Sequence, residues 1–205
     1  EWDEDNVSVV PGPIPGDTTD RLYFTGDDYP RVGTAATLVS GSSGYPVNSY
    51  RLGIPAPTSA LTAVKSGTAD DTQTPSDVSY VWTYVSAMGE EGPPSPASTV
   101  FELTDAETVV VTMGGTLAGN YNFGTTASPA GALRRIYRSN TGSTNTTFQF
   151  VGEVAYETQT FTDNKDAAQL GEVLPSGTWI GPPNDNSTVY PDGPLQGLIP
   201  LAQGV

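Results

Sequence analysis

The most informative chemical feature of the sequence is the set of reactive side chains that it lacks. The 205 residues include no histidine and no cysteine. Ser-His-Asp and Cys-His centres need an imidazole base, and the common zinc sites need imidazole or thiolate ligands. These classes of active site are therefore excluded, and so are disulfide bonds.

Paired carboxylates are the remaining candidates for acid–base chemistry. Glycoside hydrolysis requires only two carboxyl groups at a fixed separation, and the sequence places Asp27 beside Asp28 and Glu90 beside Glu91. Adjacent residues on a strand point to opposite faces, and in turns they are usually solvated. We interpret both pairs as solvated turn residues and predict that the protein is not an enzyme.

Three short polar clusters could supply oxygen ligands for calcium, at 3–6, 163–166 and 184–186. None has the spacing of an EF-hand loop, and turn formation by Asp and Asn explains all three. The Gly114–Gly115 pair is not followed by the Lys and Ser or Thr of a phosphate-binding loop. We expect no bound metal and no cofactor.

Aromatic side chains are candidates for contacts with other molecules. Tyr80, Trp82 and Tyr84 alternate along one predicted strand and so share a face. With other aromatics they could stack on sugar rings, whereas core packing and contact between subunits are the alternative explanations. The other aromatics in this group are Trp2, Tyr121, Phe123 and Trp179.

The main basic cluster lies on another predicted strand. Arg134 and Arg138 share one side of that strand, and Arg135 points to the other side. One interpretation is a solvated face balanced by nearby Glu, and the other is an ion-pair contact to an acidic neighbouring subunit. The candidate subunit-contact residues are therefore Tyr80, Trp82, Tyr84, Arg134 and Arg138.

Composition and pattern predict an all-β fold. The chain holds 23 Gly and 18 Pro with only 15% charged residues, which favours short strands joined by turns over helices. Segments rich in β-branched and aromatic residues predict strands. We expect them at 7–10, 21–25, 78–87, 108–112, 132–138, 148–154 and 158–162, and one helical turn at 166–170.

The spacing of Pro and Gly divides the chain into three parts. Residues 1–54 read as an N-terminal β-rich segment, and the Ile54-Pro55-Ala56-Pro57 stretch reads as an extended connector. Residues 55–176 hold the densest strands and predict a β-sandwich. Residues 177–205 read as an extended C-terminal segment that could return to the N-terminal body. The chain opens without Met, which suggests a segment of a longer polypeptide.

The net charge of −15 bears on possible partners. An acidic surface repels phosphates, so sequence-specific nucleic acid binding and attachment to anionic membranes are not expected. No apolar run approaches the roughly 18–20 residues that span a bilayer.

Two blocks of sequence resemble a fibronectin type III domain. Residues 136–139, 150–154 and 160–163 resemble its middle strands, and 80–96 resembles its last two strands. The order of the two blocks is reversed here. The resemblance implies a fibronectin III/immunoglobulin-like β-sandwich that is circularly permuted or rewired, flanked by short-stranded β segments of a larger body.

Segments 21–27, 84–96 and 191–198 together resemble virion structural proteins of tailed bacteriophages, in particular tail, neck or nozzle components. This resemblance implies a virion protein that assembles symmetrically with copies of itself and with adaptor, portal or tail components. An acidic surface that lined the DNA passage would let the genome slide. The alternative is a surface-displayed, adhesin-like sandwich that binds host glycan or protein through an exposed aromatic patch.

Overall fold

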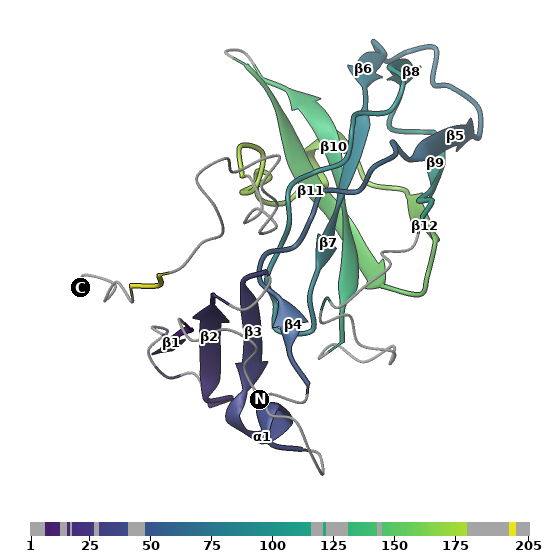
Figure 1. Ribbon diagram of the computed structural model, residues 1–205. Coiled ribbons are helices and arrows are strands. Elements are labelled where there is room, and N and C mark those ends of the chain that lie inside the picture. The colour runs from purple at the N-terminus through teal and green to yellow at the C-terminus, as the bar shows by residue number, and fades with distance from the viewer. Residues whose placement is uncertain are drawn as a thin grey trace. The chain divides into compact units, whose positions relative to one another are not determined.

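The computed structural model describes residues 7–12, 16, 18–26, 29–40, 48–115, 121, 131–142, 145–179 and 197–199. It is all-β and consists of several small antiparallel sheets, which confirms the predicted fold class at that level (Figure 1). The chain forms two compact units. Unit 1 comprises the described residues up to Gly53 with Tyr121 and 197–199, and unit 2 comprises those from 54 to 115 and from 131 to 179.

Unit 1 contains a four-stranded antiparallel sheet in which each strand pairs with the next. Its strands are β1 (Ser8–Pro11), β2 (Arg21–Thr25), β3 (Arg31–Thr34) and β4 (Tyr50–Arg51). Phe24 and Val32 are each 1% exposed and form its core. The backbone N–H of Leu198 donates to Ser8 Oγ at 3.3 Å, so the described C-terminal residues contact the first strand of this sheet.

A four-residue helix, α1 (Ala35–Leu38), follows β3 directly. The sequence did not predict it, because four residues are too few to show an apolar period. Thr34 and Thr37 form a capping box that satisfies the first amide groups of the helix. The helical turn predicted at 166–170 is present as the 3₁₀ helix η1 (Ala167–Gln169). Among the described residues no helix is long and apolar enough to cross a membrane.

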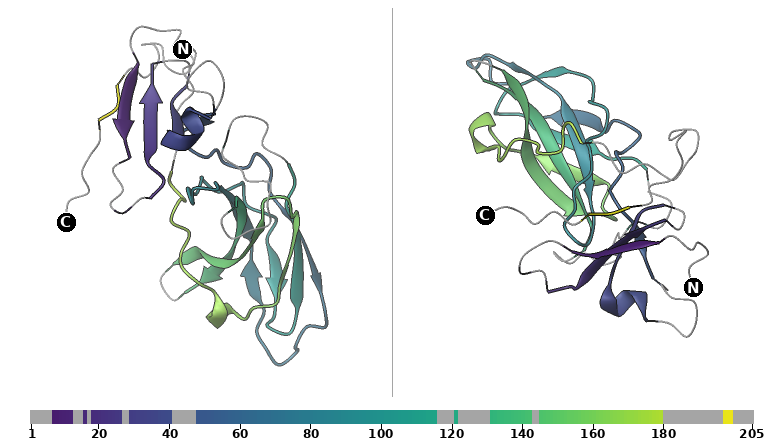
Figure 2. Two further views of the ribbon diagram at one scale, coloured as in Figure 1. Left: turned by 90° about the horizontal axis from the view of Figure 1, so that it is seen from below. Right: turned by 60° about the vertical axis from the view of Figure 1, so that its left-hand side comes forward.

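Unit 2 contains two three-stranded antiparallel sheets and a two-stranded ribbon (Figures 1 and 2). The first sheet has the order β11 (Thr146–Ala155), β10 (Leu133–Thr141), β7 (Tyr80–Val85). The second has the order β12 (Thr160–Asp163), β9 (Thr108–Thr112), β5 (Thr62–Ser66). The ribbon pairs β6 (Ser76–Val78) with β8 (Phe101–Leu103).

Irregular segments continue the first sheet at both of its edges. Beyond β7, the amides of Gly92, Ser95 and Ser98 donate to β7 carbonyls at 2.9 Å each. The prolines at 93, 94 and 96 fall between these donors, where a missing N–H removes no bond to β7. Beyond β11, residues 171–174 exchange backbone hydrogen bonds with Phe148 and Phe150.

The core of unit 2 lies where side chains of the two sheets meet. All six residues of β7 are buried, so this strand is covered on both faces, as a strand with two apolar faces predicts. From the second sheet, Val109 and Val111 of β9 are completely buried. The Tyr80 hydroxyl on β7 donates to Asp163 on β12 at 2.7 Å and joins the two sheets directly.

Candidate functional site

The five residues selected from the sequence as subunit contacts come together in the interior of unit 2. In the β7–β10 register, Arg138 lies opposite Tyr80 and Arg134 lies opposite Tyr84, with Ile136 opposite Trp82 between them. Opposite residues of antiparallel strands project to the same face, so the five side chains form one layer. Their exposed fractions are 0% for Tyr80 and Trp82, 3% for Tyr84 and Arg138, and 1% for Arg134.

Arg134 is held by carbonyl oxygens and aromatic rings. Its Nε donates to Tyr156 O at 2.7 Å, and its two terminal nitrogens donate to Met113 O at 3.3 Å and Gly115 O at 3.1 Å. The guanidinium carbon lies 5.1 Å from the ring centroids of Trp82 and Tyr156 and 5.7 Å from that of Tyr84. Arg134 therefore connects β10 to the end of β9 and to the turn after β11.

Arg138 forms a buried ion pair with Asp163 of β12. One terminal nitrogen lies 2.7 Å from Asp163 Oδ2, and the other donates to Lys165 O at 2.9 Å. Asp163 also accepts from the Tyr80 hydroxyl and from the Lys165 amide. Burial raises the pKa of Tyr80 well above its usual range, and the negative charge of Asp163 raises it further. The arrangement fixes the two sheets to each other.

These contacts correct the expectation that the five residues form a subunit contact. Each side chain is a core residue of a single chain, and its surface is not available to a neighbouring subunit. The arginine pair is likewise not a solvated face. A buried guanidinium is stable only where its donors are satisfied, and here carbonyls, rings and one carboxylate satisfy them.

A second polar cluster, centred on Glu91, lies on the other face of the first sheet. Glu91 accepts hydrogen bonds from the Thr83 hydroxyl at 2.7 Å and the Tyr137 hydroxyl at 2.6 Å. Its other oxygen lies 3.0 Å from Arg135, which also pairs with Glu153 at 3.1 Å. The Glu91 side chain is only 6% exposed, so its interpretation as a solvated turn residue is wrong. Burial and the hydrogen bond to Glu91 raise the pKa of Tyr137.

The geometry around Glu90 and Glu91 does not form a catalytic pair. Glu91 is fully engaged by its three donors, while Glu90 Oε2 lies 3.4 Å from the Ser86 hydroxyl in the tight turn after β7. Catalytic carboxylates would have to face each other across a cleft. The other candidate pair, Asp27–Asp28, lies outside the described residues.

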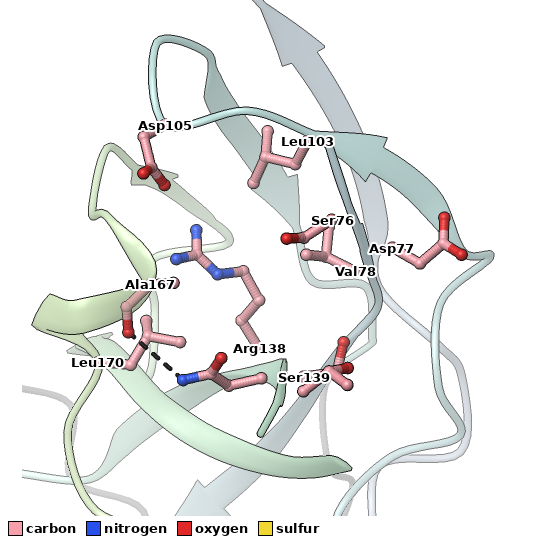
Figure 3. Close-up of a pocket in the computed structure, with 11 residues that line it drawn as sticks. Ser76, Asp77, Val78, Leu103, Asp105, Arg138, Ser139, Ala167 and Leu170 are labelled. Atoms are coloured by element: carbon pink, nitrogen blue, oxygen red, sulfur yellow. Dashed lines mark hydrogen bonds between the residues drawn. The ribbon is translucent and has the colours of Figure 1, made fainter. Parts of the chain in front are cut away.

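A small pocket opens beside Arg138, between the β6–β8 ribbon, β10 and η1 (Figure 3). Its volume of about 50 Å³ is room for a few water molecules rather than for a cofactor. Two of the polar side chains that line it have partners: Arg138 binds Asp163, and Asn140 Nδ2 donates to Gln149 at 2.6 Å and to Ala167 O at 3.4 Å.

Within the described part of the chain, no three His, Cys, Asp or Glu side chains are grouped so that they could hold a metal ion. In the predicted cluster 163–166, Asp163 is committed to Arg138 and Tyr80. The clusters at 3–6 and 184–186 lie outside the described residues.

The aromatic residues do not assemble into one exposed platform among the described residues. Tyr80, Trp82 and Tyr84 are buried, Tyr121 lies over Arg51 in unit 1, and Trp179 is 52% exposed in unit 2. Trp2 and Phe123 lie outside the described residues. Sequence reasoning missed the roles of Tyr156 and Asp163. For Asp163 a signal existed, because it shares strand parity with the apolar Phe161 and so projects to the inner face.

Comparison with known proteins does not assign the chain to a family. A scan against protein-family models found no match, and a search of curated proteins found no significant relative.

Proposed function

We propose that this chain is a structural component of a tailed bacteriophage virion, in the tail, neck or nozzle, and that it acts by symmetric assembly. The observation that carries the proposal is the use made of the chemically capable side chains in unit 2. The polar groups of Arg134, Arg138, Asp163 and Glu91 all bond to neighbouring strands or sheets. Buried polar networks of this kind make a domain rigid, as a structural scaffold requires.

The strand pairing of unit 2 supports a fibronectin III-like sandwich with rewired order. The resemblance assigns β7 and the segment after it to the last two strands of such a domain, and β10, β11 and β12 to the middle strands. In agreement with this, β7 pairs with β10, although β8 and β9 lie between them in the sequence, and Gly92–Ser98 runs along the other edge of β7. Unit 1 would then belong to the larger body that carries the sandwich.

The net charge of −15 fits a position at a DNA passage. Acidic surface at such a passage would weaken contacts with phosphates and let the genome slide. A passage found to be neutral or basic in an assembled particle would remove this part of the proposal.

The direct test is the oligomeric state of the protein, followed by its location in an assembled particle. Light scattering and electron microscopy of purified protein are expected to show a closed symmetric oligomer. Density for the unit 2 sheets in the tail or neck of a particle would support the assignment. A monomer at every concentration examined would count against it.

The alternative, an adhesin-like glycan-binding function, is less well supported by the positions of the aromatic residues. It needs ring faces open to solvent, and the alternating aromatics of β7 are enclosed. Trp179 is the exposed exception among the described tryptophans. Glycan-array binding that is lost in Trp179→Ala while folding is unchanged would favour this alternative.

A further inference from the structure

The outer face of the second sheet of unit 2 is open to solvent and carries no charge. Strand alternation and register place one set of residues on this face. In the order of the cross-strand rows, they are Thr62, Thr112 and Thr160; Val64, Val110 and Thr162; and Ser66 and Thr108. We call this set the threonine–valine face. All of them are exposed except Thr108, which is half-buried.

The charged residues of these three strands all lie on the opposite side of the sheet. Their sequences contain only two, Lys65 and Asp163. Lys65 pairs with Glu107 at 3.0 Å, and Asp163 is buried against Arg138. The threonine–valine face is therefore neutral in a chain whose net charge is −15.

At the centre of the face, Val64 and Val110 lie opposite each other, 65% and 38% exposed. Apolar side chains gain free energy when a partner covers them, at roughly 25 cal/mol per Å². Around them, each hydroxyl can both donate and accept a hydrogen bond. Within the face, the Ser66 and Thr108 hydroxyls already lie 2.9 Å apart in such a contact.

These properties favour a second copy of the chain over a strongly charged partner. Two copies of an acidic chain repel each other, and any contact that buries an unpaired carboxylate carries a desolvation penalty. A neutral face avoids that penalty, and a face of hydroxyl and methyl groups is complementary to itself. We propose that a second copy of this chain docks on the threonine–valine face, sheet against sheet, with Val64 and Val110 at the centre.

The size of the face indicates how strong this contact is. Three strands about 4.8 Å apart and up to five residues long, at about 3.3 Å per residue, give on the order of 200–250 Å² per copy. A stable pairwise interface buries roughly 800 Å² per partner. The contact is therefore weak on its own and becomes effective where a symmetric array already holds copies close together, so it rests on the proposed assembly function.

Sedimentation velocity of the full chain over a range of protein and salt concentrations tests the proposal. Salt screens the repulsion between acidic chains, so association through a neutral face is expected to strengthen with salt. Val64→Glu and Val110→Glu are each expected to weaken it at least tenfold. Val100→Glu is the matched control, because Val100 is also 65% exposed, gains the same charge and lies outside the face.

Because the chain has no cysteine, single cysteines provide a second measurement. Val110→Cys is expected to form a disulfide-linked dimer under mild oxidation, whereas Val100→Cys is not. Association that persists in both glutamate variants, or that Val100→Glu weakens equally, would overturn the proposed face and leave assembly intact. A chain that stays monomeric under all conditions would overturn the face and also count against the assembly function.

Discussion

The two three-stranded sheets of unit 2 differ in how completely they are covered. The first sheet, β11–β10–β7, has further backbone pairing at both edges and buries every residue of β7. The second sheet, β12–β9–β5, buries Val109 and Val111 on one face and leaves Val64 and Val110 open on the other. Burial is thus concentrated in the first sheet, while the second sheet has one face open to solvent.

The largest expected effect is at the centre of the covered sheet. Trp82→Ala removes a side chain that is completely buried and whose ring centroid lies 4.7 Å from that of Tyr84. We expect a loss of about 3–5 kcal/mol in the free energy of unfolding, measured by urea denaturation. A loss below about 1 kcal/mol would mean that the first sheet is not the stable element that the comparison requires.

Breaking the ion pair between the sheets is expected to cause the next largest loss of stability. Asp163→Asn leaves the Arg138 guanidinium buried without its counter-charge, and we expect about 3 kcal/mol of destabilisation. The double variant Arg138→Met with Asp163→Leu removes both charges and is expected to recover most of that loss. An equal or larger loss in the double variant would indicate that the pair contributes net stability rather than fixing the geometry of the sheets.

Alkaline pH is expected to weaken the first sheet by a smaller amount. Burial raises the pKa of Tyr80 and Tyr137 in the folded protein, whereas tyrosine in an unfolded chain titrates near pH 10. The contribution of these two tyrosines to the free energy of unfolding is therefore fully present below about pH 10, and it is lost as the pH rises through their folded-state pKa values. Urea denaturation between about pH 8 and 11 measures the decline. Tyr137→Phe should show a shallower decline, and an unchanged slope would contradict the assignment.

The smallest effect on stability is expected on the open face of the second sheet. Val110→Thr replaces a side chain that is 38% exposed by one that matches its neighbours in shape and polarity. We expect a change within about 0.5 kcal/mol by thermal or urea unfolding. A loss similar to that of Trp82→Ala would show that this face is covered within the chain.

Much of the strand layout could be predicted from the sequence. Runs of β-branched and aromatic residues correctly located β2, β7, β9, β10, β11 and β12, and the turn after Thr141 closes the β10–β11 hairpin. The short strands β3, β4, β5, β6 and β8 were not predicted. The residues of β5, β6 and β8 are mostly exposed, so these strands lack the apolar alternation by which a buried strand is found. The strands β3 and β4 have only four and two residues, which is too short to show a clear alternation.

In the candidate site, the shared face of the arginines could be predicted from one strand, but their partners could not. Alternation places Arg134 and Arg138 on one face with Ile136 between them, and this apolar neighbour was a signal that the face is buried. Alternation cannot name partners, however, and Asp163 lies 25 residues beyond Arg138 and 83 beyond Tyr80 in the sequence. Contacts of that range depend on how the sheets are arranged, which the alternation pattern of single strands does not reveal.

The prolines that follow β7 have a consequence for behaviour at high concentration. Between Gly92 and Ser98, only Ser95 and Ala97 have an amide proton, and the Ser95 amide already donates to Trp82. An incoming strand needs a row of free donors to add to a sheet. This edge of the first sheet is therefore a poor template for the addition of a strand from another copy.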